Sequence, residues 1–131
     1  MNSLIVDAQK SSPHIHFDHL THQLVISGHS YPENAAQFYH PVLTWITDYF
    51  KQAPLTQRTT FDITLIYFNT STSKSLLDLF DLLESETQKG REILLNWYYH
   101  EENDLALECG EDFRDEEDYH FPIQVTLVKA E

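Results

Sequence analysis

The sequence of 131 residues contains little cysteine, glycine or positive charge. Cys109 is its single cysteine, so no disulfide can form within the chain, and we expect a reducing, cytoplasmic location. No stretch approaches the roughly 20 consecutive apolar residues that span a bilayer, so we expect no membrane insertion. The first residues lack the apolar core of a signal peptide. We expect one domain over residues 1–131, with residues 1–12 flexible.

Positive charge is scarce, because 8 Lys and Arg residues face 21 Asp and Glu residues, for a formal net charge of −13. Phosphate backbones repel such a chain, so we expect no nucleic acid among its partners. Ten carboxylates lie between Glu101 and Asp118, opposed only by Arg114. They are interpreted as a solvated face, with a docking surface for a basic patch as the alternative.

The hydrophobic pattern predicts alternating strands and helices after an initial hairpin. The predicted strands are residues 14–18, 22–27, 59–68, 93–99 and 121–127, and the predicted helices are 34–53, 72–89 and 104–113. The order is therefore ββαβαβαβ, which favours a single α/β domain with a mixed β-sheet packed against helices. Pro122 near the start of the last strand predicts that this strand lies at a sheet edge.

Two local features complete the predicted architecture. Ser30 and Glu33 have the spacing of a capping box at a helix start after a break at Gly28, and Asn34 is a second possible cap. Pro41 predicts a kink or split in the helix that follows.

The strand over residues 59–68 has apolar residues on both of its faces. Phe61, Ile63, Leu65 and Tyr67 alternate onto one face, whereas Ile66 and Phe68 alternate onto the other. The pattern therefore predicts a central strand covered on both sides.

A cluster of hydroxyl residues, Thr70-Ser71-Thr72-Ser73, separates this strand from the next predicted helix, with Asn69 before it and Lys74 after it. Unpaired N–H groups and the helix dipole stabilise a phosphate at such a position. Phosphorylation would add about −1.5 to −2 charges there at pH 7. An ordinary N-cap is the competing structural interpretation. From spacing alone, the hydroxyl groups are interchangeable.

Two other interpretations, a nucleophilic enzyme and a metal site, compete with a phosphorylation switch at the hydroxyl cluster. Ser71 to Lys74 fit the short S-x-x-K nucleophile pattern, but the partner motifs of that enzyme class are missing. A small hydrolase using Ser71 or Thr70, and a passive interaction subunit without a switch, stay as alternatives. His14, His16, His19 and His22 crowd one hairpin without a completing carboxylate or cysteine, so we expect exposed histidines, no metal and no cofactor.

Several motifs resemble the SiaC family of bacterial regulatory phosphoproteins. Residues 28–34 match its G-x-S-Y-P-E-N signature, and residues 67–74 are similar to its Y-[LF]-N-T-S-S-x-K segment, with Thr72 and Ser73 as the departure. Residues 79–84, 96–99 and 111–114 resemble the next helix, the next strand and the end of the third helix. The resemblance runs in order and with matching spacing from about residue 12 to the C-terminus.

The resemblance implies a STAS-like fold, as in anti-sigma-factor antagonists, and a role in partner switching rather than catalysis. It implies a Ser/Thr kinase of the histidine-kinase-like ATPase type, an opposing PP2C-like phosphatase and a diguanylate cyclase effector, linked to c-di-GMP signalling and biofilm formation. By motif position the phosphate acceptor is Thr70, with Ser71 and Ser73 as alternatives. The residues that would support the switch are Asn69, Ser71, Thr72, Ser73 and Lys74.

The signature around residue 31 has two interpretations. It is either a capped helix entry or a partner-binding surface beside the switch, formed by Tyr31, Pro32, Glu33 and Asn34.

Overall fold

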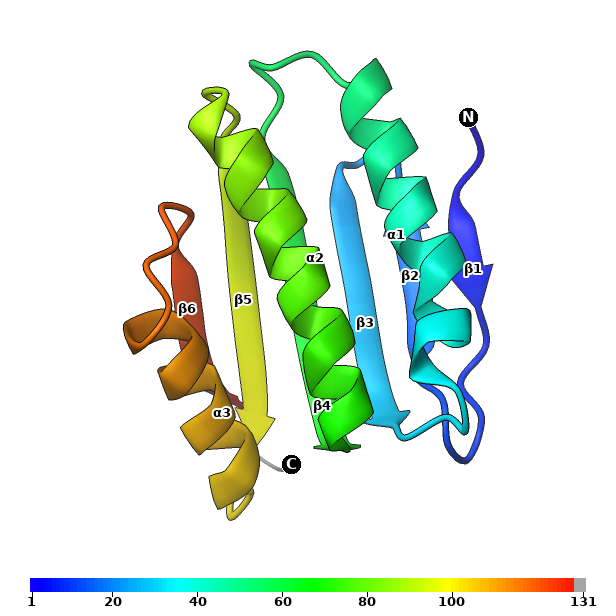
Figure 1. Ribbon diagram of the computed structural model, residues 1–131, viewed down its shortest axis with the longest axis vertical. Coiled ribbons are helices and arrows are strands. Elements are labelled where there is room, and N and C mark those ends of the chain that lie inside the picture. Colours follow the sequence, from blue (N-terminus) through cyan, green and yellow to red (C-terminus); the bar gives the residue numbers. More distant parts are fainter. Residues whose placement is uncertain (129–131) are drawn as a thin grey trace.

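The computed structural model describes residues 1–128 as a six-stranded sheet with three helices packed on it (Figure 1). The strands are β1 (Leu4–Val6), β2 (His14–Asp18), β3 (Gln23–Ser30), β4 (Thr59–Phe68), β5 (Ile93–His100) and β6 (Ile123–Val128). The helices are α1 (Ala35–Gln52), α2 (Thr70–Gln88) and α3 (Asp104–Asp115). The strands lie in sequence order across the sheet, so the predicted mixed α/β fold is confirmed, and β6 lies at an edge as Pro122 indicated.

The direction of the strands explains where the helices lie. β1, β2 and β3 pair antiparallel, whereas β3, β4, β5 and β6 pair parallel. β4, β5 and β6 follow β3 in one direction across the sheet, so each crossover connection runs the same way. Right-handed crossovers therefore place all three helices on one face of the sheet (Figure 1). The prediction that β4 is covered on both sides is therefore wrong, because Thr60, Asp62 and Thr64 on its other face are only half-buried.

A bulge near the end of β4 changes which side chains face the helices. Gly28 pairs with Leu65 and His29 pairs with Tyr67, so Ile66 is an extra residue without a partner in β3. The extra residue reverses the alternation of side chains. Tyr67 therefore lies exposed, and Phe68 is buried instead, with its ring centroid 5.8 Å from that of Trp97.

The start of the chain is part of the sheet. β1 pairs with β2, and the indole nitrogen of Trp45 in α1 donates a hydrogen bond of 2.8 Å to the carbonyl oxygen of Asn2. This strand was not predicted from the sequence, and with it the order of elements is βββαβαβαβ. A strand of three residues is too short for its sequence pattern to be distinctive.

The predicted capping box and strand break are also wrong. Asn34 caps α1, since its side-chain oxygen accepts a hydrogen bond of 3.0 Å from the N–H of Gln37. Ser30 is instead the buried last residue of β3. Gly28 does not end that strand, because β3 continues through it at a φ of 112°. α1 runs through Pro41 as a single helix, so it is not split there.

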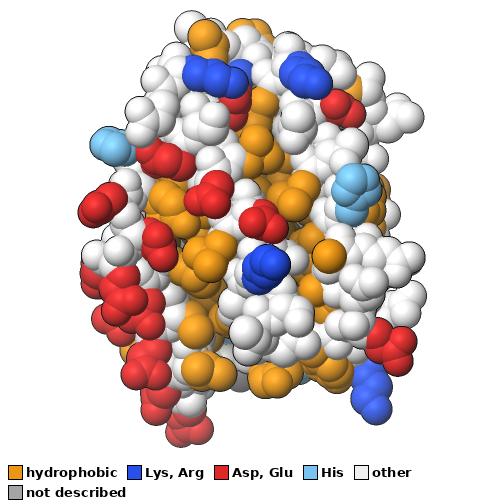
Figure 2. Space-filling view, in the orientation of Figure 1, with side chains coloured by type: hydrophobic (Ala, Val, Ile, Leu, Met, Phe, Trp, Pro, Cys, Tyr) orange, Lys and Arg blue, Asp and Glu red, His pale blue; other side chains and the backbone are white. Residues whose placement is uncertain are grey.

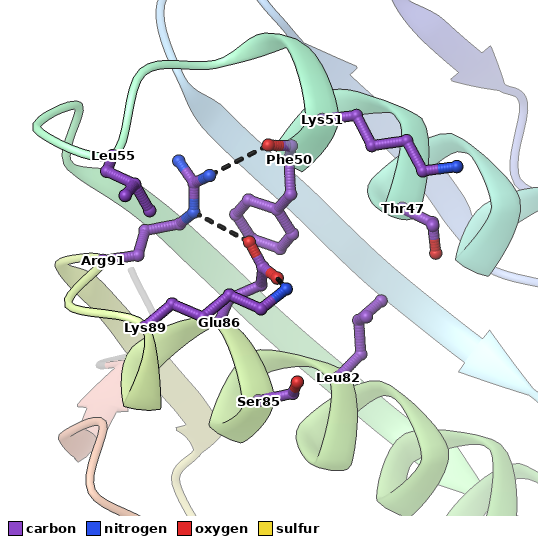
Figure 3. Close-up of a pocket in the computed structure, with 9 residues that line it drawn as sticks. All are labelled: Thr47, Phe50, Lys51, Leu55, Leu82, Ser85, Glu86, Lys89 and Arg91. Carbon is purple, nitrogen blue, oxygen red and sulfur yellow. Dashed lines mark hydrogen bonds and ion pairs between the residues drawn. The ribbon is translucent and has the colours of Figure 1, made fainter.

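A buried ion pair holds the helices together at the end of the molecule where α1 and α2 finish (Figure 3). The guanidinium Nε of Arg91 lies 3.1 Å from Oε1 of Glu86, and its Nη2 donates a hydrogen bond of 2.9 Å to the carbonyl oxygen of Phe50. The guanidinium also lies 4.7 Å from the centroid of the Phe50 ring. Phe50, Glu86 and Arg91 line a hollow of about 330 Å³. Their contacts fix the end of α1 against the end of α2.

Candidate functional site

The two sequence motifs meet at the edge of the sheet where the parallel strands end. β3 ends at Ser30, and α2 begins at Thr70 directly after β4. The N–H of Asn69 donates a hydrogen bond of 3.2 Å to the carbonyl oxygen of Ser30. Neighbouring parallel strands end at the same edge, so the sheet brings together segments about 40 residues apart in sequence.

A buried hydroxyl network joins the two motifs. The Oγ of Ser30 lies 2.6 Å from the phenol oxygen of Tyr39 and 2.8 Å from Oγ1 of Thr72. The hydroxyl of Thr72 also lies 2.9 Å from the carbonyl oxygen of Ser30, within reach to donate a hydrogen bond to it. Ser30 and Thr72 are fully buried, so all three hydroxyl groups depend on one another for partners.

Burial keeps the phenol of Tyr39 in its neutral form. It raises the pKa of Tyr39 to about 12, although hydrogen bonds from Ser30 and Thr72 oppose the shift. At neutral pH the phenol therefore retains its proton and can donate it within the network. This network fixes the start of α2 against both β3 and α1.

The predicted acceptor residues differ strongly in exposure. Thr70 and Ser71 are exposed in the first turn of α2, and Ser73 is half-buried. Thr72 is fully buried, so it is inaccessible to a modifying enzyme and acts as a structural residue. Asn69 caps the helix by accepting a hydrogen bond of 3.0 Å from the N–H of Thr72.

A groove of about 500 Å³ runs between the first turns of α1 and α2. Glu33 and Asn34 line it from α1, and Ser71 and Lys74 line it from α2. The partner-binding residues predicted from the first motif therefore adjoin the predicted switch. Tyr31 and Pro32 are half-buried beside the groove.

Within residues 1–128, neither Thr70 nor Ser71 has the partner that would activate it as a nucleophile. No hydrogen bond links the side-chain hydroxyl of Thr70 or Ser71 to a histidine or carboxylate, as nucleophilic catalysis requires. Residues 1–128 also contain no group of three or more His, Cys, Asp or Glu side chains placed to hold a metal. Of the crowded histidines, His22 contacts the phenol oxygen of Tyr49 at 2.6 Å, so it belongs to a structural contact.

Comparison with known proteins agrees with this geometry. The model of the SiaC family of regulatory phosphoproteins matches residues 6–126. The chain belongs to the SiaC family. An uncharacterized protein of Pseudomonas aeruginosa (strain UCBPP-PA14) is 35% identical over 126 residues, which cover 95% of this chain and 97% of that protein.

Solved structures of SiaC proteins match this chain over almost their whole length. SiaC of Pseudomonas aeruginosa is 31% identical, with a TM-score of 0.88 over 98% of this chain and 100% of that one. The structure of the diguanylate cyclase SiaD in complex with its activator SiaC, from the same species, matches at 32% identity, with a TM-score of 0.87 over 95% of this chain and 99% of that one. No helix in residues 1–128 is long and apolar enough to cross a membrane.

Sequence reasoning missed two parts of this SiaC-family site. Tyr39 was not distinguished from its apolar neighbours in α1, because its role depends on a contact with Ser30 made only in the folded chain. The exposure of Ile66 and Tyr67 depends on the bulge in β4. Apolar residues at consecutive positions near the strand end were the available signal for that bulge.

Proposed function

We propose that this protein is a regulatory phosphoprotein that binds and activates a diguanylate cyclase, and that phosphorylation of Thr70 controls the binding. A kinase of the histidine-kinase-like ATPase type would add the phosphate, and a PP2C-like phosphatase would remove it. The protein would act in the cytoplasm through association rather than catalysis. The observation that carries the proposal is the exposed hydroxyl of Thr70 in the first turn of α2, beside the Tyr31–Asn34 motif.

The choice of a cyclase as effector rests on similarity. A SiaC protein 32% identical to this chain is the activator of a diguanylate cyclase and forms a complex with it. The similarity covers 95% of this chain, and the SiaC family model matches residues 6–126, which include both motifs. Extending the same activity to this chain therefore requires no additional domain.

The choice of Thr70 rests on exposure and motif position together. Burial excludes Thr72, and Ser73 is half-buried. Ser71 is as accessible as Thr70, but it lines the groove between α1 and α2 and follows the motif position of the acceptor. Thr70 is therefore the preferred acceptor, with Ser71 and Ser73 as the alternatives.

The effect of the phosphate follows from its charge and its position. A phosphate on Thr70 would lie at the positive end of the α2 dipole, where anions are stabilised. Lys74, one turn further along the helix, is exposed and without a carboxylate partner among the described residues. The modified protein would remain folded while a group of about −2 charge blocks the adjoining surface.

The acceptor can be tested with the cognate kinase and ATP. Wild-type protein should gain one phosphate, and Thr70→Ala should gain none. Ser71→Ala and Ser73→Ala are the matched controls, and both should be modified like the wild type. Incorporation of phosphate into Thr70→Ala at the wild-type rate would show that another hydroxyl is the acceptor.

The effector can be tested by measuring c-di-GMP synthesis by purified cyclase. Unmodified protein should stimulate the cyclase, and Thr70→Glu should stimulate it less and bind it more weakly. A carboxylate carries less charge than phosphate, so enzymatically phosphorylated protein should have the larger effect. Equal stimulation by unmodified and phosphorylated protein would contradict the switch.

A further inference from the structure

An exposed apolar surface lies next to the phosphorylation segment. Ile66, Tyr67 and Leu105 are 45%, 47% and 54% exposed, which is high for large apolar side chains. With Tyr31 they form what is called here the edge patch, at the edge where β3, β4 and β5 end.

Two contacts make the edge patch continuous. The rings of Tyr31 and Tyr67 pack edge to face, with centroids 5.5 Å apart. The side-chain nitrogen of Asn103 donates a hydrogen bond of 2.8 Å to the carbonyl oxygen of Ile66, which fixes the start of α3 against the end of β4. Leu105 follows two residues later in the first turn of α3. The patch therefore extends across three elements instead of consisting of isolated side chains.

The bulge in β4 is what exposes the patch. Without the extra residue at Ile66, regular alternation would place Tyr67 on the helix-covered face with Leu65. Bulges that turn a side chain outward are common next to functional sites. The regular pairing of β3 with β4 is interrupted at Ile66, and Ile66 and Tyr67 are exposed there. Tyr67 is three residues before Thr70.

Carboxylates border the edge patch on the side of α3. Glu101, Glu102, Asp104 and Glu108 are all exposed, and Figure 2 shows acidic side chains gathered over α3. No lysine or arginine lies between residues 92 and 113. An apolar centre with a charged rim is the usual organisation of a protein interface, and this rim complements positive charge.

We propose that the edge patch is the docking surface for the diguanylate cyclase, and that it binds a segment presenting apolar side chains flanked by lysine or arginine. The inference rests on the proposed function and specifies the surface and the chemistry of its partner. Apolar side chains would pack on Tyr31, Ile66, Tyr67 and Leu105. Basic side chains would face the carboxylates at the start of α3.

This location explains how a phosphate on Thr70 would act. Thr70 begins α2 directly beside the apolar part of the patch. Bringing an apolar segment onto that surface would remove water from the phosphate, and desolvating a dianion is costly even at a helix start near Lys74. Attraction between the phosphate and distant basic side chains is screened by salt and cannot offset that cost.

Substitutions in the edge patch provide the main test. Ile66→Thr and Leu105→Ser should each weaken binding of unmodified protein to purified cyclase about tenfold or more, through faster dissociation. Leu20→Ser and Leu55→Ser are matched controls, since these leucines are 77% and 50% exposed but lie away from the edge. Melting temperatures of all four variants identify any loss of binding that comes from unfolding.

Charge substitutions test the chemistry of the partner. Glu101→Gln with Glu108→Gln should slow association and flatten its dependence on salt. Asp48→Asn with Asp81→Asn removes the same charge from exposed positions in later turns of α1 and α2, away from the patch, and should have a smaller effect. Association that responds equally to both pairs would overturn the basic character of the segment.

The outcomes separate this inference from the proposed function. Wild-type binding that Ile66→Thr and Leu105→Ser leave unchanged would overturn the edge patch alone, with the phosphorylation switch intact. Folded wild-type protein that fails to bind the cyclase would overturn both. Binding lost in the patch variants and kept in the leucine controls is the result expected.

Discussion

Ser30 and Thr72, 42 residues apart in the sequence, lie with their hydroxyl oxygens 2.8 Å apart in the core. One residue ends β3 and the other lies in the first turn of α2. Thr72 therefore fixes the turn that carries Thr70, although it cannot itself be modified. Within one cluster of four hydroxyl residues, the fold separates a buried structural residue, Thr72, from the exposed Thr70 and Ser71.

Thr72→Val should lower the free energy of unfolding by about 1–2 kcal/mol, because valine keeps the shape and removes two buried hydrogen bonds. Thr70→Val is the matched control and should change it by less than about 0.5 kcal/mol at an exposed position. Chemical denaturation of both variants measures the difference. Equal values would contradict the structural role of Thr72.

Tyr39→Phe should make the protein less sensitive to alkali. The pKa of Tyr39 is raised from 10.0 to about 12 in the folded protein, so its burial stabilises the fold below pH 10, and that stabilisation is lost as the pH rises towards 12. Replacing the phenol removes this loss, which is up to about 3 kcal/mol for this rise in pKa. Denaturation at pH 8 and pH 11 should show a smaller decrease for the variant than for the wild type.

Gly110→Ala should destabilise the protein, although alanine favours helices by about 1 kcal/mol over glycine. A methyl group at Gly110 would overlap the indole ring of Trp97, whose nitrogen donates a hydrogen bond of 2.9 Å to the carbonyl oxygen of Ala106. Overpacking of this kind costs about 1–3 kcal/mol. Glu108→Ala on the exposed face of α3 is the control, and thermal unfolding should rank it well above Gly110→Ala.

Arg91→Met should lower the free energy of unfolding by about 3–5 kcal/mol, because it removes the buried cation and leaves the Glu86 carboxylate with only the exposed Lys89 as a partner. Lys89→Met removes the second cation bound to the same carboxylate, at 2.7 Å, but the Lys89 side chain is 60% exposed. Its loss should cost less than about 1 kcal/mol. Urea denaturation of the two variants gives the comparison, and similar costs would contradict the buried ion pair as the anchor of α1 and α2.

The sequence was sufficient for the fold class because hydrophobic periodicity marks long elements clearly. It misplaced Tyr67 and Phe68 because strict alternation was extended through a bulge, and a bulge is specified by pairing with β3 that no local pattern reveals. It assigned Ser30 to a helix cap for a similar reason. A serine satisfies a cap or a buried hydroxyl equally well, and the position of Tyr39 and Thr72 decides between them.

The sequence predicted which motifs belong to the candidate site, but not which apolar side chains are exposed around it. The motifs predicted the segment around Thr70 and, as one of two interpretations, a partner-binding surface around Tyr31 beside it. Their proximity depends on the parallel pairing of β3 with β4, and the exposure of Leu105 depends on the packing of α3. Relations between distant segments require the assembled sheet.

The order of the strands in the sheet also determines where the positive ends of the helix dipoles lie. α1, α2 and α3 all begin at the edge where the parallel strands end, and each is capped by a neutral asparagine: Asn34, Asn69 and Asn103. α1 and α2 have no acidic residue in their first turn, so the positive ends of their dipoles are not cancelled there. For a chain of net charge −13, a polyanion therefore meets less negative charge at the starts of α1 and α2 than at the start of α3, whose first turn contains Asp104.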